Sequence, residues 1–103
     1  MNEVEKMYRN LGIKKIELVY PDNFKPFYPD FTAEKQIEIL KALVFNNKAM
    51  SITQYYPHKQ FCINNDMFIG IGEDFGEALA MFVNYLWQDL TEEERKQIKE
   101  ILE

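Results

Sequence analysis

Apolar residues recur every three or four positions in four stretches of the chain, which is the spacing of one helix face. A residue that can cap a helix N-terminus precedes each stretch, and the last two stretches open on a capping-box pattern. The pattern therefore predicts helices over residues 3–11, 33–46, 75–89 and 92–102, with Asn2, Thr32, Asp74 and Thr91 as their caps.

Two of these helices carry a more specific expectation. Residues 78–87 are apolar nearly all round, which predicts a helix buried by a sheet on one side and by another helix or a second chain on the other. Because a short chain has little surface with which to cover such a helix, we expect a homodimer. For the helix over 33–46, we expect an inner stripe made of Ala33, Ile37, Leu40, Leu43 and Val44.

Alternation of apolar and polar residues predicts β-strands in two parts of the chain. One strand is predicted over 13–20, where Pro21 ends it. Residues 49–72 contain three short segments joined by turn-forming residues, which predicts an antiparallel meander. Gly70 and Gly72 in the last segment predict a close approach of another backbone, or a bulge.

The segment 21–31 combines prolines with aromatic residues. The prolines exclude a helix interior and a central strand, and the aromatic side chains favour an ordered loop over a linker. The loop either covers the core as a lid or forms part of a partner or self-association surface, since aromatic residues are enriched at interface cores. Its aromatic residues are Phe24, Phe27, Tyr28 and Phe31.

Together these elements predict a single α+β domain, an α/β/α-type sandwich with a three- to four-stranded antiparallel sheet and flanking helices. The length of 103 residues is typical of one domain. The expected parts are a helix and strand (1–20), a Pro/aromatic loop (21–31), a helix–meander–helix core (32–90) and a C-terminal helix (91–103).

The distribution of charge narrows the classes of partner. The net charge is −5, and residues 60–94 hold eight acidic residues and neither lysine nor arginine. Such a segment would repel a nucleic-acid backbone, so we expect no nucleic-acid partner. The acidic segment either presents a face to a basic protein or only keeps the domain soluble. Glu73, Asp74 and Asp89 are the candidate contact residues.

Other features bear on compartment and membrane contact. The sequence contains no apolar run of membrane-spanning length and no apolar stretch of the signal-peptide type near its start. A single cysteine excludes an internal disulfide framework and suits a reducing compartment. We therefore expect a cytoplasmic protein without membrane contact.

Candidate catalytic and metal-binding residues are few. Cys62 and His58 could pair as nucleophile and base, and Asp66 would add a third metal ligand. However, Cys62 is more simply a partly exposed strand residue and His58 a turn residue. The Gly70-x-Gly72 pair lacks the third glycine of a dinucleotide-binding motif. We therefore expect no catalytic residues, no metal and no cofactor, and the sequence favours a non-catalytic protein.

Three stretches, together with the central hairpin, resemble phage and prophage proteins of Firmicutes. They are Tyr28–Gln36, Gly70–Leu79 and Trp87–Glu94. The order of helix, hairpin, Gly-x-Gly-Glu-x-Phe-x-Glu-Ala and long apolar helix over roughly 28–94 is similar to the phage ABA sandwich domain. This resemblance implies an α/β/α sandwich in the host-cell cytoplasm, and the family brings no assigned activity. The same junction is also similar to HicB-like antitoxins.

These observations lead to one expected function and two alternatives. We expect a phage or prophage accessory protein that acts by protein–protein interaction. One alternative is a HicB-like antitoxin-type module. The other is a small ligand-binding or enzymatic domain with a pocket between the sheet and the aromatic loop, lined by residues such as Tyr20, Tyr28, Tyr55, Tyr56 and His58.

Overall fold

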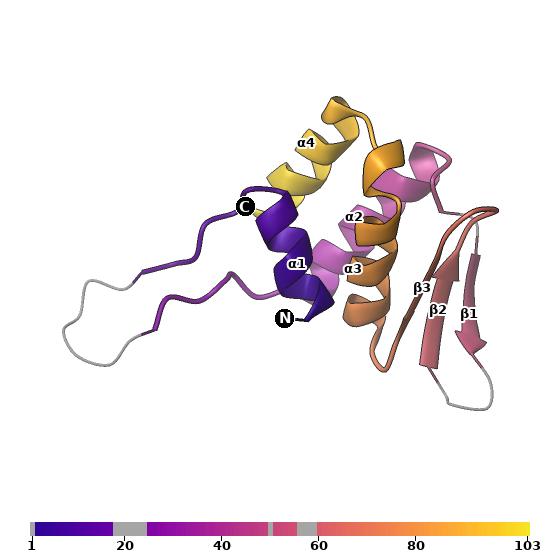
Figure 1. Cartoon of the computed structure of the whole chain (residues 1–103), viewed down its shortest axis with the longest axis horizontal. Helices are drawn as coiled ribbons and strands as arrows, with labels where there is room; N and C mark the ends of the chain where they lie inside the picture. Colours follow the sequence, from indigo (N-terminus) through magenta and orange to yellow (C-terminus); the bar gives the residue numbers. More distant parts are fainter. Residues whose placement is uncertain (1, 18–24, 50, 56–59) are drawn as a thin grey trace.

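The computed structural model describes residues 2–17, 25–49, 51–55 and 60–103. These residues form an α+β fold with flanking helices and an antiparallel sheet, as the sequence predicts (Figure 1). The helices are α1 (Glu3–Asn10), α2 (Ala33–Phe45), α3 (Phe75–Tyr85) and α4 (Glu92–Leu102), with the short 3₁₀ helix η1 (Trp87–Asp89). The strands are β1 (Ser51–Tyr55), β2 (Gln60–Asn64) and β3 (Ile69–Gly72).

The helices begin at the caps that the sequence predicts. The side chains of Asn2, Thr32 and Asp74 each accept a hydrogen bond from the backbone N–H three residues later, at 2.8, 3.3 and 2.8 Å. Thr91 forms a complete capping box with Glu94, because the hydroxyl of Thr91 accepts from the Glu94 N–H and the Glu94 carboxylate accepts from the Thr91 N–H. These bonds satisfy N–H groups that have no partner inside the helix.

The prediction of one helix over 75–89 is wrong in its last turn. The α-helix ends at Tyr85, and η1 follows after Leu86. Leu86 and Leu90 are both buried, so the chain is anchored on each side of η1 as it turns towards α4. A tighter 3₁₀ turn is a common way to end an α-helix where the chain changes direction.

The sheet is the predicted antiparallel meander, with strand order β1-β2-β3. Helix α3 packs against β3 and β2. A Cβ atom added at Gly70 would lie 2.6 Å from the backbone nitrogen of Phe82, and one at Gly72 would lie 2.6 Å from the backbone nitrogen of Ala78. The predicted close backbone approach is therefore confirmed, and the other backbone is that of α3.

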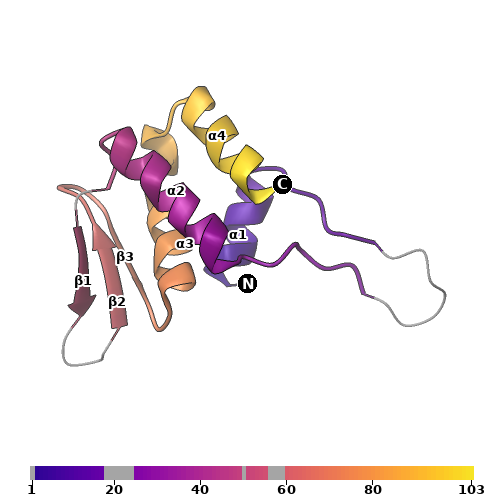
Figure 2. The ribbon, with the colours of Figure 1, turned by 180° about the vertical axis from the view of Figure 1, so that it is seen from behind.

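The core is built around α3. This helix lies between the sheet and α1, α2 packs beside it, and α4 packs against α2 (Figures 1 and 2). The expectation that residues 78–87 are buried on more than one side is confirmed for the body of α3, whose fully buried residues include Leu79, Phe82 and Val83. The elements that bury α3 belong to the same chain, so the burial of this helix does not itself require a second copy of the chain.

The prediction of a strand over 13–20 is wrong for its described part. Residues 13–17 do not join the sheet, and the structure shows a sheet of three strands and not four among the described residues. Instead, Ile16 exchanges backbone hydrogen bonds with Phe27, at 2.6 and 3.2 Å. The two segments form an arm that projects from α1 on the side opposite the sheet, so α1 and α3 lie between them and the sheet (Figures 1 and 2). Residues 18–20 and Phe24 lie outside the described residues.

Candidate functional site

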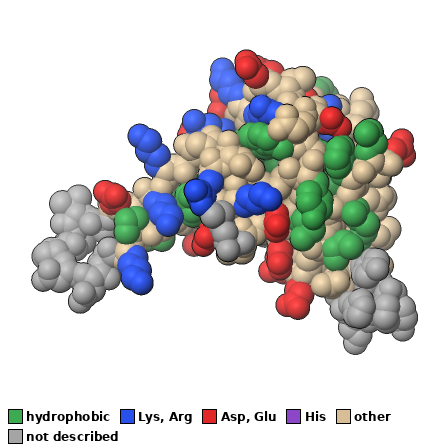
Figure 3. All heavy atoms as spheres, in the orientation of Figure 1, with side chains coloured by type: hydrophobic (Ala, Val, Ile, Leu, Met, Phe, Trp, Pro, Cys, Tyr) green, Lys and Arg blue, Asp and Glu red, His purple; other side chains and the backbone are tan. Residues whose placement is uncertain are grey.

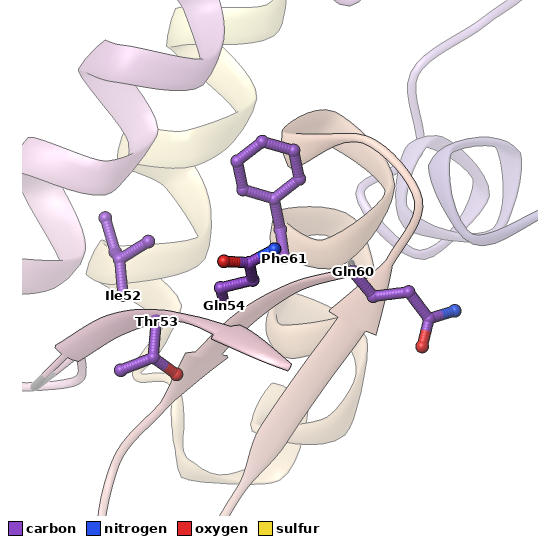
Figure 4. A pocket seen from close by; sticks show the side chains of 5 residues that line it. All are labelled: Ile52, Thr53, Gln54, Gln60 and Phe61. Carbon is purple, nitrogen blue, oxygen red and sulfur yellow. The ribbon is translucent and has the colours of Figure 1, made fainter. Parts of the chain in front are cut away.

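Helix α3 packs on β2 and β3, and its contacts do not extend to β1 at the edge of the sheet among the described residues. Figure 4 shows Ile52, Gln54 and Phe61 rising from one face of the sheet, while Thr53 points from the opposite face. Ile52 is 47% exposed and Phe61 42% exposed, although both lie on the helix-facing side. A depression of about 300 Å³ lies here, lined by Ile52, Thr53, Gln54, Gln60 and Phe61.

Helix α2 forms the second wall of this region. A neighbouring depression of about 190 Å³ is lined by Leu40 and Val44 of α2, by Ala49, and by Ser51 and Ile52 at the start of β1. Ile37 lies two helical turns before Val44 on the same side of α2, and the two are 50% and 54% exposed. We call this region the α2–β1 surface, defined by Ile37, Leu40, Val44, Ile52 and Phe61.

The expected inner stripe of α2 is confirmed at Leu43, and Leu40 packs partly buried against the core, but the expectation is wrong at the exposed Ala33, Ile37 and Val44. The fully buried residues of this helix are Ile39 and Leu43, whereas Ile37 and Val44 face the other way and are half exposed. Apolar residues on two sides of one helix cannot be sorted by spacing alone, because both sets recur at helical intervals. The sequence missed the α2–β1 surface for this reason, although α2 has more apolar residues than one buried face needs.

The main chain of β1 is also open on its outer side. The backbone N–H of Ile71 points away from β2, at the outer edge of β3, and donates to the sulfur of Met81 at 3.3 Å. Because inward and outward directions alternate along an antiparallel strand, its partner Cys62 directs its main chain towards β1, where it pairs with Thr53. The backbone groups of Ile52 and Gln54 therefore point away from β2, and no other described strand pairs with them.

The aromatic loop divides between core and surface. The ring of Tyr8 in α1 lies 5.2 Å from that of Tyr28 and 6.3 Å from that of Phe31, so these two loop residues serve as a lid. Phe27 is 44% exposed and is available for contact, and Phe24 lies outside the described residues. The lid is therefore confirmed for Tyr28 and Phe31, and a partner contact through Phe27 stays a prediction.

A pocket of about 350 Å³ lies between α1 and the aromatic loop, not between the sheet and the loop as expected. The loop and the sheet lie on opposite sides of the helices, which keeps them apart (Figures 1 and 2). The hydroxyl of Tyr8 is buried and has no hydrogen-bond partner among the described residues. Burial raises the pKa of Tyr8 from 10.0 to about 12, and the carboxylate of Asp30 adds to this shift. Lys15 and Asp30 also line this pocket.

The candidate chemical residues do not assemble into a site. Cys62 is buried, at 4% exposure, so the expectation of a partly exposed cysteine is wrong. Its sulfur lies 3.7 Å from the side-chain nitrogen of Asn64. Asp66 is exposed, and His58 lies outside the described residues. Within the described ranges, no three His, Cys, Asp or Glu residues are grouped so that they could hold a metal ion.

The structure places the candidate acidic residues at two ends of α3. Glu73 and Asp74 are exposed at its N-terminus, and Asp89 lies in η1 beyond its C-terminus. The 11 residues of α3 separate them by about 16 Å. Near Asp89, the ammonium group of Lys48 donates to the Asp89 carbonyl at 2.9 Å and lies 3.7 Å from the Glu94 carboxylate. Lys48 comes from outside the acidic segment, so counting charge within that segment missed it.

Figure 3 shows basic side chains gathered on the side of α1 and the arm, and acidic side chains in separate groups over the face shown. Comparison of the chain with family models, curated proteins and solved structures found no match. Among the described residues, no helix combines the length and the apolar character that crossing a membrane requires.

Proposed function

We propose that this chain is a non-catalytic domain that acts by binding protein through the α2–β1 surface. The observation that carries the proposal is the exposure of four apolar side chains on one side of the molecule. Ile37, Val44, Ile52 and Phe61 are between 42% and 54% exposed, and Ile52 lines both the depression on β1 and β2 and the one between β1 and α2. A contiguous apolar patch on a small domain is typical of a protein-binding surface.

The composition of the surface supports this function. The five defining residues are all apolar, and β1 carries no charged residue along its length. Lys41 of α2 lies one helical turn from both Ile37 and Val44, and its ammonium group forms an ion pair with Glu38 at 3.3 Å. Interface cores are similarly depleted of charged residues and enriched in large apolar ones.

The biological setting follows from the resemblance of residues 28–94. It supports a phage or prophage accessory protein in the host cytoplasm, and a HicB-like antitoxin-type module would use the same kind of protein contact. A basic protein is a further partner class, supported by the exposed carboxylates of Glu73 and Asp74. Those residues lie beside Phe61, because Gly72 pairs with Phe61 and the Phe75 ring lies 6.1 Å from the Phe61 ring, so such a partner would contact the border of the α2–β1 surface.

The substitution Val44→Glu tests the proposal, because it places a charge in the middle of the α2–β1 surface at a half-exposed position that tolerates it. We expect the variant to fold and to lose most of the protein association of the parent chain, including association with its own copies. Light scattering of the purified chain and quantitative affinity capture from host extract both measure this loss.

Phe27→Glu is the matched control, because Phe27 is a similarly exposed apolar residue on the arm at the other end of the molecule. We expect this variant to associate as the parent does. Loss of association with Phe27→Glu and not with Val44→Glu would move the contact to the arm and contradict the proposal.

A second function is favoured by one observation, the buried Tyr8 hydroxyl without a partner beside a pocket of about 350 Å³. A small ligand with a hydrogen-bond acceptor would satisfy this hydroxyl, and Lys15 or Asp30 would select its charge. Ligand-observed NMR with small aromatic acids and amines tests this function. If a compound binds and Tyr8→Phe weakens its binding, this second function is supported. If neither the acids nor the amines bind, it is contradicted.

A further inference from the structure

We propose that the occupant of the α2–β1 surface is a second copy of this chain, joined by antiparallel pairing of the two β1 strands. This inference rests on the proposed function and names its partner. It follows from the direction of the main chain of β1, from the state of the other sheet edge, and from the charge of the strand.

The main chain of β1 is suited to pairing with itself. Ile52 and Gln54 direct their backbone groups outward, and Thr53 lies midway between them. A two-fold axis at Thr53 therefore lets Ile52 of each copy exchange backbone hydrogen bonds with Gln54 of the other. Thr53 then meets Thr53 of the second copy as a non-hydrogen-bonded pair, whose side chains are close neighbours.

The other edge of the sheet does not offer the same opportunity. By the same alternation, Ile69 and Ile71 are the two residues of the four-residue β3 that turn their backbone groups outward, and the N–H of Ile71 already donates to the sulfur of Met81 from α3. Pairing is therefore directed to β1. Because each copy has one such open edge, the association closes at two chains instead of continuing as a filament.

Charge favours a second copy as the occupant. Native edge strands often carry lysine, proline or a bulge that prevents pairing, but β1 has neither a charged residue nor proline, and its register with β2 runs unbroken over all five residues. Two chains of net charge −5 repel each other except where they meet through an uncharged surface. The α2–β1 surface meets that requirement.

The two-fold arrangement also accounts for the exposed face of α2. Antiparallel edge pairing puts the axis perpendicular to the sheet, so the helices of both copies lie on the same side of a six-stranded sheet. The two α2 helices then run antiparallel above the paired β1 strands. Their Ile37 and Val44 side chains then add cover to Ile52, which stays 47% exposed in the single chain although Val44 lines a depression with it.

A charge-swap experiment at Thr53 tests the pairing. Thr53→Lys and Thr53→Glu each place like charges opposite one another at the axis, so each variant alone should dimerise about tenfold more weakly. An equal mixture of the two variants places lysine opposite glutamate and should restore dimerisation to the level of the parent chain. Sedimentation velocity measures both, with the parent at twice the 12.3 kDa chain mass.

Two further variants make the test specific. Gln54→Pro removes an outward N–H without removing a bond to β2, so it should abolish dimerisation and preserve the fold. The pair Met67→Lys and Met67→Glu makes the same charge changes in the exposed β2–β3 turn, at a position 76% exposed, and should leave dimerisation unchanged.

The outcomes separate this inference from the proposed function. If the parent chain stays monomeric and Val44→Glu loses capture of a different protein, the inference that a second copy is the partner is overturned. The proposed protein-binding function then still stands. If the parent chain is monomeric and Val44→Glu captures the same proteins as the parent, both the inferred dimer and the proposed function are overturned. If the parent chain dimerises and neither Thr53→Lys nor Thr53→Glu weakens the dimer, the inferred pairing of the two β1 strands is overturned.

Discussion

At the scale of single residues, Tyr8 combines a tightly packed ring with a buried hydroxyl that has no hydrogen-bond partner among the described residues. Its ring packs between Tyr28 and Phe31, and its side chain is 1% exposed, yet the hydroxyl has no hydrogen-bond partner among the described residues. A buried hydroxyl without a partner costs free energy that the ring packing must offset.

Tyr8→Phe keeps the ring and removes the hydroxyl. We expect the free energy of unfolding to rise by about 1 kcal/mol at neutral pH, since the unpaired polar group is lost and its contacts remain. Urea denaturation measures the change. A loss of stability instead would show that the hydroxyl has a stabilising partner.

The buried hydroxyl of Tyr8 also makes the stability of the fold depend on pH in the alkaline range. Burial raises the pKa of Tyr8 from 10.0 in the unfolded chain to about 12 in the fold. The neutral hydroxyl therefore favours the fold fully below about pH 10, and this contribution is lost as the pH rises towards 12. We expect Tyr8→Phe to lose less stability than the parent between these values. Parallel losses in both proteins would contradict the shift.

At the scale of elements, the contact between β3 and α3 depends on two glycines. A Cβ atom at Gly70 meets the backbone of α3, so Gly70→Ala must push the helix from the sheet, at a cost of about 3 kcal/mol. Gly12 differs, because its φ is +73° but no atom lies within 4 Å of an added Cβ. Gly12→Ala should therefore cost only about 1 kcal/mol. Equal costs for the two variants in urea denaturation would contradict this contact.

Local signals predicted most of the elements. The caps at Asn2, Thr32, Asp74 and Thr91 and the meander over 49–72 depend on residues close in the sequence, and they are confirmed. Pairing between distant segments was not predictable in the same way. The described part of 13–20 alternates as a strand does, but it pairs with the loop at Phe27 because α1 and α3 separate it from the sheet.

The candidate site was harder to predict than the fold. Whether Ile37 and Val44 face the core or solvent depends on which side of α2 meets α3 and α4, and both sides of this helix are apolar. The exposure of Ile52 depends in turn on how far α3 extends across the sheet. The spacing of nearby residues predicts neither of these facts, because both depend on how the helices pack on each other and on the sheet. The α2–β1 surface could therefore be identified only in the folded structure.

At the scale of the whole molecule, the arm and the sheet lie at opposite ends, with the helices between them (Figure 1). The aromatic-loop pocket belongs to the first end, and the α2–β1 surface belongs to the second. The two candidate functions therefore use separate regions, and substitutions in one leave the other unchanged. The central claim is that the second end is a protein contact, formed through the open edge of β1.

Amide hydrogen exchange at Ile52 and Gln54 tests this claim most directly, because their N–H groups point to the open edge. We expect both amides to exchange more slowly as the protein concentration rises, while the amide of Met67, which donates to Asn65 Oδ1 in the β2–β3 turn, keeps its rate. In Thr53→Lys, which should dimerise about tenfold more weakly, we expect this protection to need about tenfold more protein. Exchange at the rate of exposed amides at every concentration would contradict the claim.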